Sequence, residues 1–556
     1  MEFEGVGIGE SDFKMLRMRK NYFIDKSLYI KDIIDNDSKV ILVTRPRRFG
    51  KTLNMSMLKY FFDCDSKDSK EMFKGLKIME QSEKYISQMG AYPCIYLTMK
   101  DLNVRNFEFM LMQLKTAIME IFFEKRYLLE SEIPEGERVV FNKILAANIN
   151  EMELLNSIKM LTRMLCNYYN KPVMLFIDEY DVPLQTAYVE GYYEEAIKFL
   201  RTFYVTTFKD NAYLKKTVLT GVSRVAKESI FSGANNFDVY TVLNNEFADD
   251  FGITSEEVDK ALKDFDLEEQ KEEVKKWYDG YRIGNVEGLY NPWSLLNFLS
   301  KKELVPYWVN TSSNDLIKLT LKNSVSVKEK MERLLKGEAI EVPINLETII
   351  VGIENNEDNV WGLMLGTGYL KVVETVNLEE GIYKVELPNY EIKLMFQEMV
   401  REWFKDKGIG NNLKDILKDL VDLNLYEFER KFRVLVEKMF SYMDVGRNTA
   451  ENFYHAFVLG ILVGLKDIYY VNSNRESGFG RYDIMLEPQD KSKNSFIIEF
   501  NVADEMDEPS LEQAVENGKK QIEEKDYENS LKERGFRNIT KMVFAFKGKD
   551  FKIAVL

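Results

Sequence analysis

KVILVTRPRRFGKTLNMSML, residues 39–58, is the stretch that decides the fold of this chain. Its first part, residues 39–44, is a short β-branched apolar run, which predicts a buried parallel strand. Residues 45–52 form a basic turn that ends in Gly-Lys-Thr, and residues 53–62 carry apolar side chains at helical spacing. A strand, a glycine-bearing turn and a helix that begins with Lys-Thr are the context of a phosphate-binding P-loop.

The turn is predicted to bind ATP. Backbone N–H groups and the helix N-terminus present positive partial charge, so they can cradle phosphates. Lys51 is predicted to reach the terminal phosphates, and the Thr52 hydroxyl to ligate Mg²⁺. The predicted nucleotide-binding residues are Arg47, Arg48, Phe49, Gly50, Lys51, Thr52 and Leu53.

One position departs from the general motif. The pattern G-x-x-x-x-G-K-[ST] requires glycine at position 45, where this chain has Arg45 followed by Pro46. On the pattern alone, a basic surface turn before a helix remains the alternative.

A second strand, residues 173–177, ends in Asp178 and Glu179. It would deliver two carboxylates to the edge where α/β sheets bind ligands. Asp178 is predicted to hold Mg²⁺, directly or through water, and Glu179 to polarise the attacking water. Alone, this pattern is equally explained by a capped strand end; after a P-loop, it favours ATP binding.

A third strand, residues 216–222, ends in Ser223 and Arg224. A polar side chain beside the Asp178 strand can sense the γ-phosphate. Arg224 can stabilise transferred charge, either in its own subunit or across the interface of a homo-oligomer. The alternative for Arg224 is an ion pair with nearby acids.

Composition indicates a folded protein of roughly three or four domains, with 556 residues, 45% hydrophobic and 30% charged. We expect neither a signal peptide nor a membrane span, because residues 1–10 lack a basic and apolar leader and no apolar run approaches about 18 residues. Three scattered cysteines favour a reducing, cytoplasmic location. The net charge of −15 requires any DNA contact to use a local basic patch.

Residues 5–300 resemble the bacterial and archaeal AAA-ATPase-like family of the wider P-loop AAA+/STAND group. The resemblance lies in YFIDKS, RPRRFGKTLNMSML, LFIDEYDVPL, LTGVSRVAKESIFSGANNF, KWYDGY and LYNPWSLLNFL. That family typically has Arg-Pro-Arg-Arg-Phe-Gly-Lys in its P-loop, so Arg45 is a family variant. The resemblance implies ATP binding through Gly50, Lys51 and Thr52.

The C-terminal region carries a second group of acids. Strands predicted at 480–486 and 495–501 can pair as a hairpin, which would bring Asp483 opposite Glu499. The predicted helix 449–466 has Glu451 near its start. Carboxylates from adjacent strands and a helix are what a Mg²⁺-dependent phosphodiesterase needs, although solvated hairpin acids are the plain alternative.

Residues 445–556 resemble the PD-(D/E)XK nuclease domain that often follows this ATPase. The resemblance lies in ENFYHAFVLGIL, GRYDIML, IIEF and QIEEKDY. It implies that Asp483 and Glu499 are metal carboxylates and that Glu451 is an accessory acid. It also implies that Gln521 and Tyr527 belong to the supporting helix.

The catalytic lysine of that superfamily is replaced here by Asn501. Asparagine can donate a hydrogen bond but brings no charge, and loss of one such electrostatic group costs a few kcal/mol of transition-state stabilisation. Either a neighbouring cation (Lys519, Lys520 or Arg481) substitutes, or cleavage is weak or absent. His455 lies on an apolar helix and is interpreted as a packed side chain.

The expected architecture is α/β, with an ATPase core at 1–250, a helical or winged-helix-like lid at 251–345, a mixed then helical connector at 346–443, and a restriction-endonuclease-like domain at 444–556. Within it, residues 310–345 are expected to be helical. The expected function is an ATPase that controls a Mg²⁺-dependent nuclease acting on DNA, in defence or mobile-element biology. The alternatives are a nucleotide-gated binding or signalling protein with an inactive nuclease domain, and an assembly scaffold with ATP as a structural ligand.

Overall fold

The computed structural model divides the chain into two compact units. Unit 1 comprises Met1–Asn323 and Glu341–Glu391, and unit 2 comprises Ser324–Ile340 and Ile392–Leu556. The residues that the structure describes are 3–225, 237–308, 325–348, 357–404, 413–440, 458, 461–462, 465, 468–477, 480–503, 510–525, 527–547 and 550–556.

A sheet of five parallel strands, in the order β2-β3-β4-β1-β6, forms the centre of unit 1. Its strands are β1 (Val40–Thr44), β2 (Cys94–Thr98), β3 (Val173–Asp178), β4 (Leu214–Gly221) and β6 (Phe237–Tyr240). The parallel α/β fold and the strands predicted around 39–44, 173–177 and 216–222 are confirmed. Because the strands run the same way, their carboxyl ends share one edge of the sheet.

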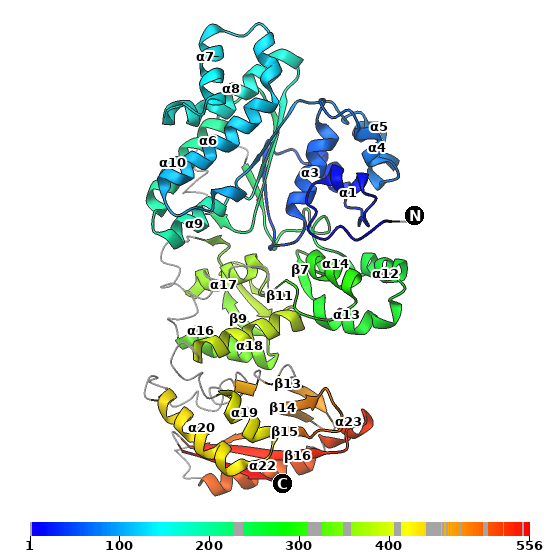
Figure 1. The fold of residues 1–556 in the computed structure, drawn as a ribbon, viewed down its shortest axis with the longest axis vertical. Helices are drawn as coiled ribbons and strands as arrows, with labels where there is room; N and C mark the ends of the chain where they lie inside the picture. The colour runs from blue at the N-terminus through cyan, green and yellow to red at the C-terminus, as the bar shows by residue number, and fades with distance from the viewer. Residues whose placement is uncertain are drawn as a thin grey trace. The chain divides into compact units, whose positions relative to one another are not determined.

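Helices cover both faces of this sheet (Figure 1). Side chains alternate along β1, so Val40 and Leu42 contact one helical layer while Ile41 and Val43 contact the other. The first layer includes α6 (Phe107–Glu124), α8 (Glu151–Tyr169) and α10 (Tyr193–Phe208), and the second includes α2 (Leu28–Asp35) and α3 (Lys51–Phe62). Burial on both faces explains why the strands are continuously apolar.

A helical subdomain with a short hairpin follows the sheet along the chain. Its elements are α12 (Ser255–Asp264), α13 (Lys271–Tyr278), β7 (Tyr281–Ile283), β8 (Val286–Leu289) and α14 (Pro292–Lys301). Val258, Val274 and Phe298 lie in its hydrophobic core. We call residues 251–308, which are part of the region 251–345 predicted to be a lid, the lid.

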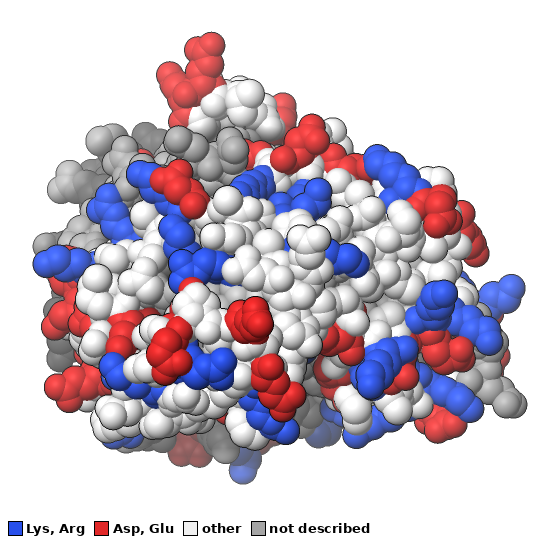
Figure 2. Space-filling view, turned by 90° about the horizontal axis from the view of Figure 1, so that it is seen from above, with Lys and Arg blue, Asp and Glu red and all other residues white. Residues whose placement is uncertain are grey.

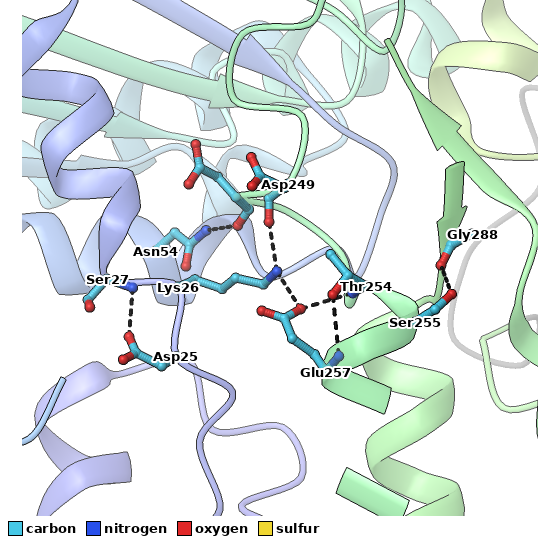
Figure 3. A network of polar contacts seen from close by, with 10 residues as sticks. Asp25, Lys26, Ser27, Asn54, Asp249, Thr254, Ser255, Glu257 and Gly288 are labelled. Carbon is cyan, nitrogen blue, oxygen red and sulfur yellow. Dashed lines mark hydrogen bonds and ion pairs between the residues drawn. The ribbon is translucent and has the colours of Figure 1, made fainter. Parts of the chain in front are cut away.

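Lys26, in the YFIDKS segment, ties the N-terminal region to the lid (Figure 3). Its ammonium donates to the Asp249 carbonyl at 2.7 Å and to Glu257 Oε2 at 2.6 Å. Glu257 also closes the capping box of α12 with Thr254. In the same network, Asn54 of α3 donates to the Asp250 carbonyl at 2.9 Å. The helix that follows the P-loop is therefore fixed to the segment that leads into the lid.

Unit 1 also holds α17 (Glu357–Thr367) and a three-stranded sheet in the order β11-β12-β9. Its strands are β9 (Ile340–Pro343), β11 (Lys371–Asn377) and β12 (Ile382–Glu386). The helix expected over 310–345 is wrong at residues 340–343, because they take part in this sheet. Of that range, residues 310–324 lie outside the described part, and α16 (Val325–Lys336) is helical as expected.

Unit 2 contains a mixed sheet in the order β13-β14-β15-β16-β17, in which β15 and β16 are parallel and the other neighbours antiparallel. Its strands are β13 (Tyr469–Ser477), β14 (Gly480–Pro488), β15 (Ser495–Val502), β16 (Ile539–Lys547) and β17 (Asp550–Val555). Helices α19 (Leu413–Val421) and α20 (Leu425–Phe440) share a core with this sheet. Helix α22 (Leu511–Lys525) packs on β15 and β16 through a separate cluster.

Candidate functional site

Arg45, the residue that replaces the first P-loop glycine, is fully buried at the end of β1. Its guanidinium donates to the backbone carbonyls of Thr44, Tyr240, Thr241, Glu246 and Phe247. Burial lowers the pKa of Arg45 to about 10, so it stays protonated at neutral pH. The arginine thus joins the start of the P-loop to the segment after β6, which explains why a bulky residue fits there.

Lid residues contact the middle of the P-loop. The Arg48 guanidinium lies 4.3 Å from the ring centroid of Trp293, and Arg48 has a left-handed φ of 64°. Trp308 Nε1 donates to the Arg47 carbonyl at 3.0 Å. Phe49 is buried, and its ring meets Tyr281 edge to face at 5.0 Å. The loop conformation is therefore coupled to the lid.

The Lys51 ammonium lies inside the loop. It donates to the carbonyls of Arg45 at 3.1 Å and Pro46 at 2.7 Å, and the side chain is buried. Burial lowers the pKa of Lys51 to about 8, and the negative charges of Glu179 and Asp178 partly offset this by raising it. Gly50 caps α3 with a φ of 83°, which glycine adopts without strain.

Thr52 and Asp178 meet at the carboxyl edge of the sheet. Thr52 Oγ1 donates to Asp178 Oδ2 at 2.7 Å, and Thr220 Oγ1, from the adjacent β4, donates to Asp178 Oδ1 at 2.5 Å. The carboxylate is buried at 1% exposure. A hydroxyl and a carboxylate held this close are hard oxygen donors of the kind that Mg²⁺ takes beside a nucleotide, so the residues fit that ion.

Glu179 follows Asp178 with a left-handed φ of 55°, which turns the chain sharply after β3. Its carboxyl is partly buried, and burial followed by the charge of Asp178 raises its pKa, while Lys51 lowers it. A raised pKa makes the carboxylate a better proton acceptor, as a general base requires.

Asp181 fixes the end of β4, a role that the sequence did not reveal. Its Oδ2 accepts from the Ser223 N–H and hydroxyl, both at 2.8 Å, and from the Val222 N–H at 3.1 Å. Gln185 donates to the same oxygen at 2.6 Å and to Ser223 Oγ at 3.1 Å, and accepts from Arg47 at 3.4 Å. The sequence feature that could have indicated this role is the second aspartate of the Asp-Glu-Tyr-Asp segment, residues 178–181.

Arg224 begins the short strand β5 (Arg224–Val225), which pairs with β10 (Glu347–Thr348). Its side chain lies outside what the structure describes, so its predicted catalytic role stays a prediction. Leu53, the last predicted nucleotide-binding residue, is partly buried on α3.

In unit 2, Asp483 and Glu499 lie at adjoining positions of neighbouring strands. Ile484 pairs with Ile498, and the Phe500 N–H donates to Asp483 Oδ2 at 2.8 Å. Glu499 is fully buried; its Oε1 accepts from Gln521 Nε2 of α22. Its Oε2 is buried without a hydrogen-bond partner among the described residues.

Burial, followed by the charge of Asp483, raises the pKa of Glu499 to about 9. An acid pair with an unsatisfied buried oxygen fits a divalent cation, which would satisfy that oxygen and favour the ionised form. Within the described part of the chain no group of three or more metal-ligating side chains occurs, and Glu451 and His455 lie outside that part.

Asn501 is partly exposed on β15, two positions beyond Glu499 and on the same face. Of the cations predicted to replace the motif lysine, Lys519 pairs with Glu516 at 2.8 Å and Lys520 pairs with Glu524 at 3.6 Å. The Arg481 side chain lies outside the described residues. Tyr527 is buried just after α22, and burial, followed by the charge of Glu499, raises its pKa.

Two family models match the chain where these sites lie. Residues 7–231 match the AAA-ATPase-like family, described as a predicted AAA-ATPase, and residues 449–555 match the PD-(D/E)XK nuclease superfamily. The protein therefore combines an AAA-ATPase-like domain with a C-terminal domain of the PD-(D/E)XK nuclease superfamily.

A relative in Azotobacter chroococcum mcd 1, described as an uncharacterized protein in the vnfD 5' region, is 24% identical over 402 residues. The matched part covers 72% of this chain and 70% of the relative. Among the described residues, no helix is long and apolar enough to cross a membrane.

Proposed function

We propose that unit 1 binds and hydrolyses ATP with Mg²⁺, and that its nucleotide state controls a Mg²⁺-dependent nuclease site in unit 2 that acts on DNA. The observation that carries the proposal is the meeting of Thr52 and Asp178 beside the buried Lys51, at the carboxyl edge of a parallel sheet. The match of residues 449–555 to a nuclease superfamily supports the second half.

Lys51 would carry phosphate recognition. Its ammonium now donates to two loop carbonyls, and phosphate oxygens are stronger acceptors for the same donors. Thr52 and Asp178 would hold Mg²⁺, which supplies charge neutralisation at the phosphates when bound. Glu179 would accept a proton from the attacking water, for which its raised pKa suits it.

Nucleotide binding would reach the lid through the P-loop itself. Arg47, Arg48 and Phe49 touch Trp308, Trp293 and Tyr281, so a rearrangement of the loop backbone changes the contacts of the lid. The Arg47–Gln185 contact offers a parallel connection to Ser223 at the end of β4. Through these contacts, a change of the loop on phosphate binding can be transmitted from the nucleotide site to the lid and to the end of β4.

Asp483 and Glu499 would hold the metal of the nuclease site, and Gln521 would orient Glu499. Bound Mg²⁺ supplies a Lewis acid for the scissile phosphate and acidifies its bound water. The face in Figure 2 intersperses Lys and Arg with Asp and Glu around a broad uncharged area, so the described residues drawn there form no continuous basic patch.

A second candidate function is a nucleotide-gated binding or signalling protein whose nuclease-like domain does not cleave. The observation that favours it is Asn501, which leaves the motif position without a cation. A cytoplasmic location fits both functions, because Cys64, Cys94 and Cys166 are all unpaired thiols.

One experiment separates the two functions. The full chain is incubated with linear duplex or single-stranded DNA, Mg²⁺ or Mn²⁺, with and without ATP. We expect cleavage by the native protein and none by Asp483→Ala, while Asp490→Ala, in the exposed turn after β14, cleaves normally. Cleavage that survives Asp483→Ala would refute the site, and absence of cleavage by every protein would favour the binding function.

A further inference from the structure

The nuclease site lacks a cation at the motif position, yet helix α22 brings one to the same carboxylates. Gly518 allows this helix to approach the sheet closely, because a Cβ there would lie 2.6 Å from Val543 Cγ1 on β16. Three residues further on, Gln521 donates to Glu499. The face of α22 that contains Gln521 therefore lies over the site.

Lys525 is on that face. It follows Gln521 by four positions, so the two side chains lie one above the other on the helix. Lys525 is the last residue of α22 and is partly buried. Its positive charge lies within electrostatic reach of the Glu499 carboxyl.

The other lysines of α22 are engaged elsewhere. Lys519 and Lys520 form ion pairs with Glu516 and Glu524, acids of their own helix, and the Lys520 side chain is 75% exposed. Lys525, by contrast, has the Glu499 carboxyl within electrostatic reach. Its charge is thus available to the acid pair.

We propose that the Lys525 ammonium, presented by α22, supplies the positive charge that Asn501 cannot supply from β15. This inference rests on the proposed nuclease function. In the hydrolysis, a water oxygen bonds to phosphorus and the bond from phosphorus to the leaving sugar oxygen breaks. A water proton is released, and the leaving oxygen gains a proton. Lys525 stabilises the negative charge that develops on the phosphate oxygens, and so acts where a motif lysine would.

The test uses four full-length variants in the Mg²⁺ and Mn²⁺ cleavage assay: Lys525→Ala, Lys525→Arg, Asn501→Lys, and Lys525→Ala combined with Asn501→Lys. Lys532→Ala is the matched control, since it removes an exposed lysine of the next helix, α23 (Glu528–Glu533), that has no part in the proposed site. We expect Lys525→Ala to cleave about 100-fold more slowly. Lys525→Arg should retain most activity, and Lys532→Ala should cleave within about two-fold of the native rate. Thermal unfolding of each variant checks the fold.

The double variant distinguishes chemistry from structure. If Lys525 supplies the charge, Asn501→Lys restores cleavage in the Lys525→Ala background, whereas a merely structural defect is not rescued. Native-like cleavage by Lys525→Ala, with Asp483→Ala inactive, overturns the inference and leaves the nuclease function standing. An inactive native protein that becomes active with Asn501→Lys also overturns it. If both are inactive, the proposed nuclease function itself fails.

Discussion

The Arg45 guanidinium donates a 2.8 Å hydrogen bond to the carbonyl of Phe247, far along the chain from the P-loop that Arg45 begins. Four further backbone carbonyls share the same guanidinium. The residue that breaks the general P-loop pattern is thus a buried connector between β1 and the segment that leads into the lid.

Arg45→Gly, which restores the general P-loop motif, should destabilise this protein. The change removes a buried charge and leaves carbonyls without a donor, which costs roughly 3 kcal/mol or more in the free energy of unfolding. Thermal and urea unfolding measure the loss. Arg126→Ala, at an exposed position, is the control. A variant as stable as the native protein would show that the hydrogen bonds of Arg45 contribute nothing to the free energy of unfolding.

Lys51→Ala should weaken ATP binding by about 100-fold or more, because the loop loses the buried ammonium that we propose binds the phosphates. Calorimetry with ATP and Mg²⁺ measures the affinity. Lys59→Ala, further along α3, serves as the matched control and should bind ATP normally. Unchanged affinity in Lys51→Ala would remove the P-loop assignment.

Glu179→Gln should separate ATP binding from hydrolysis. The substitution keeps the side-chain shape but removes the proton acceptor, so turnover should fall about 100-fold or more while ATP affinity stays within a few-fold. Phosphate release and calorimetry report the two quantities. A Glu179→Gln protein that hydrolyses ATP at the native rate would rule out Glu179 as the base.

Asp250 should make stability depend on pH. Burial, followed by Asp32 and Asp249, raises its pKa well above the ordinary 3.8, against the charges of Lys26 and Arg45. The folded protein therefore keeps a proton that the unfolded chain releases. This contribution is complete below about pH 4 and is lost as pH rises towards the folded pKa, by up to about 1.4 kcal/mol per pH unit.

Asp250→Asn cannot ionise, so its stability relative to the native protein should increase from pH 5 to pH 8. The groups that face this carboxyl are Asp32, Asp249, Lys26, Arg45 and Tyr29. Urea unfolding at several pH values measures the difference. A constant difference between the two proteins over this range would contradict the assignment of a protonated Asp250.

The sequence predicted those elements whose signal is local. The apolar runs of β1, β3 and β4 are buried on both faces, and the residues that follow them carry the motif chemistry. Asp483 and Glu499 could likewise be placed together, because strand alternation and a short polar turn determine their pairing.

Features that depend on distant partners were not predictable. The structural role of Arg45 was not predictable because most of its acceptors lie about 200 residues away, at the end of β6 and after it. The role of Asp181 was not predictable because it depends on the residues that follow β4. The short strand β9 was mistaken for helix because its partner β12 comes about 40 residues later. Lys525 gains significance only once α22 is docked on β15.

The most direct test of the account measures DNA cleavage by the full chain with Mg²⁺ at increasing ATP concentration. We predict that ATP changes the native cleavage rate at least several-fold, with a midpoint at the measured ATP affinity, and that Lys51→Ala abolishes this response without abolishing cleavage. A native cleavage rate independent of ATP, or a Lys51→Ala protein that responds as the native protein does, would contradict control of the nuclease site by the P-loop.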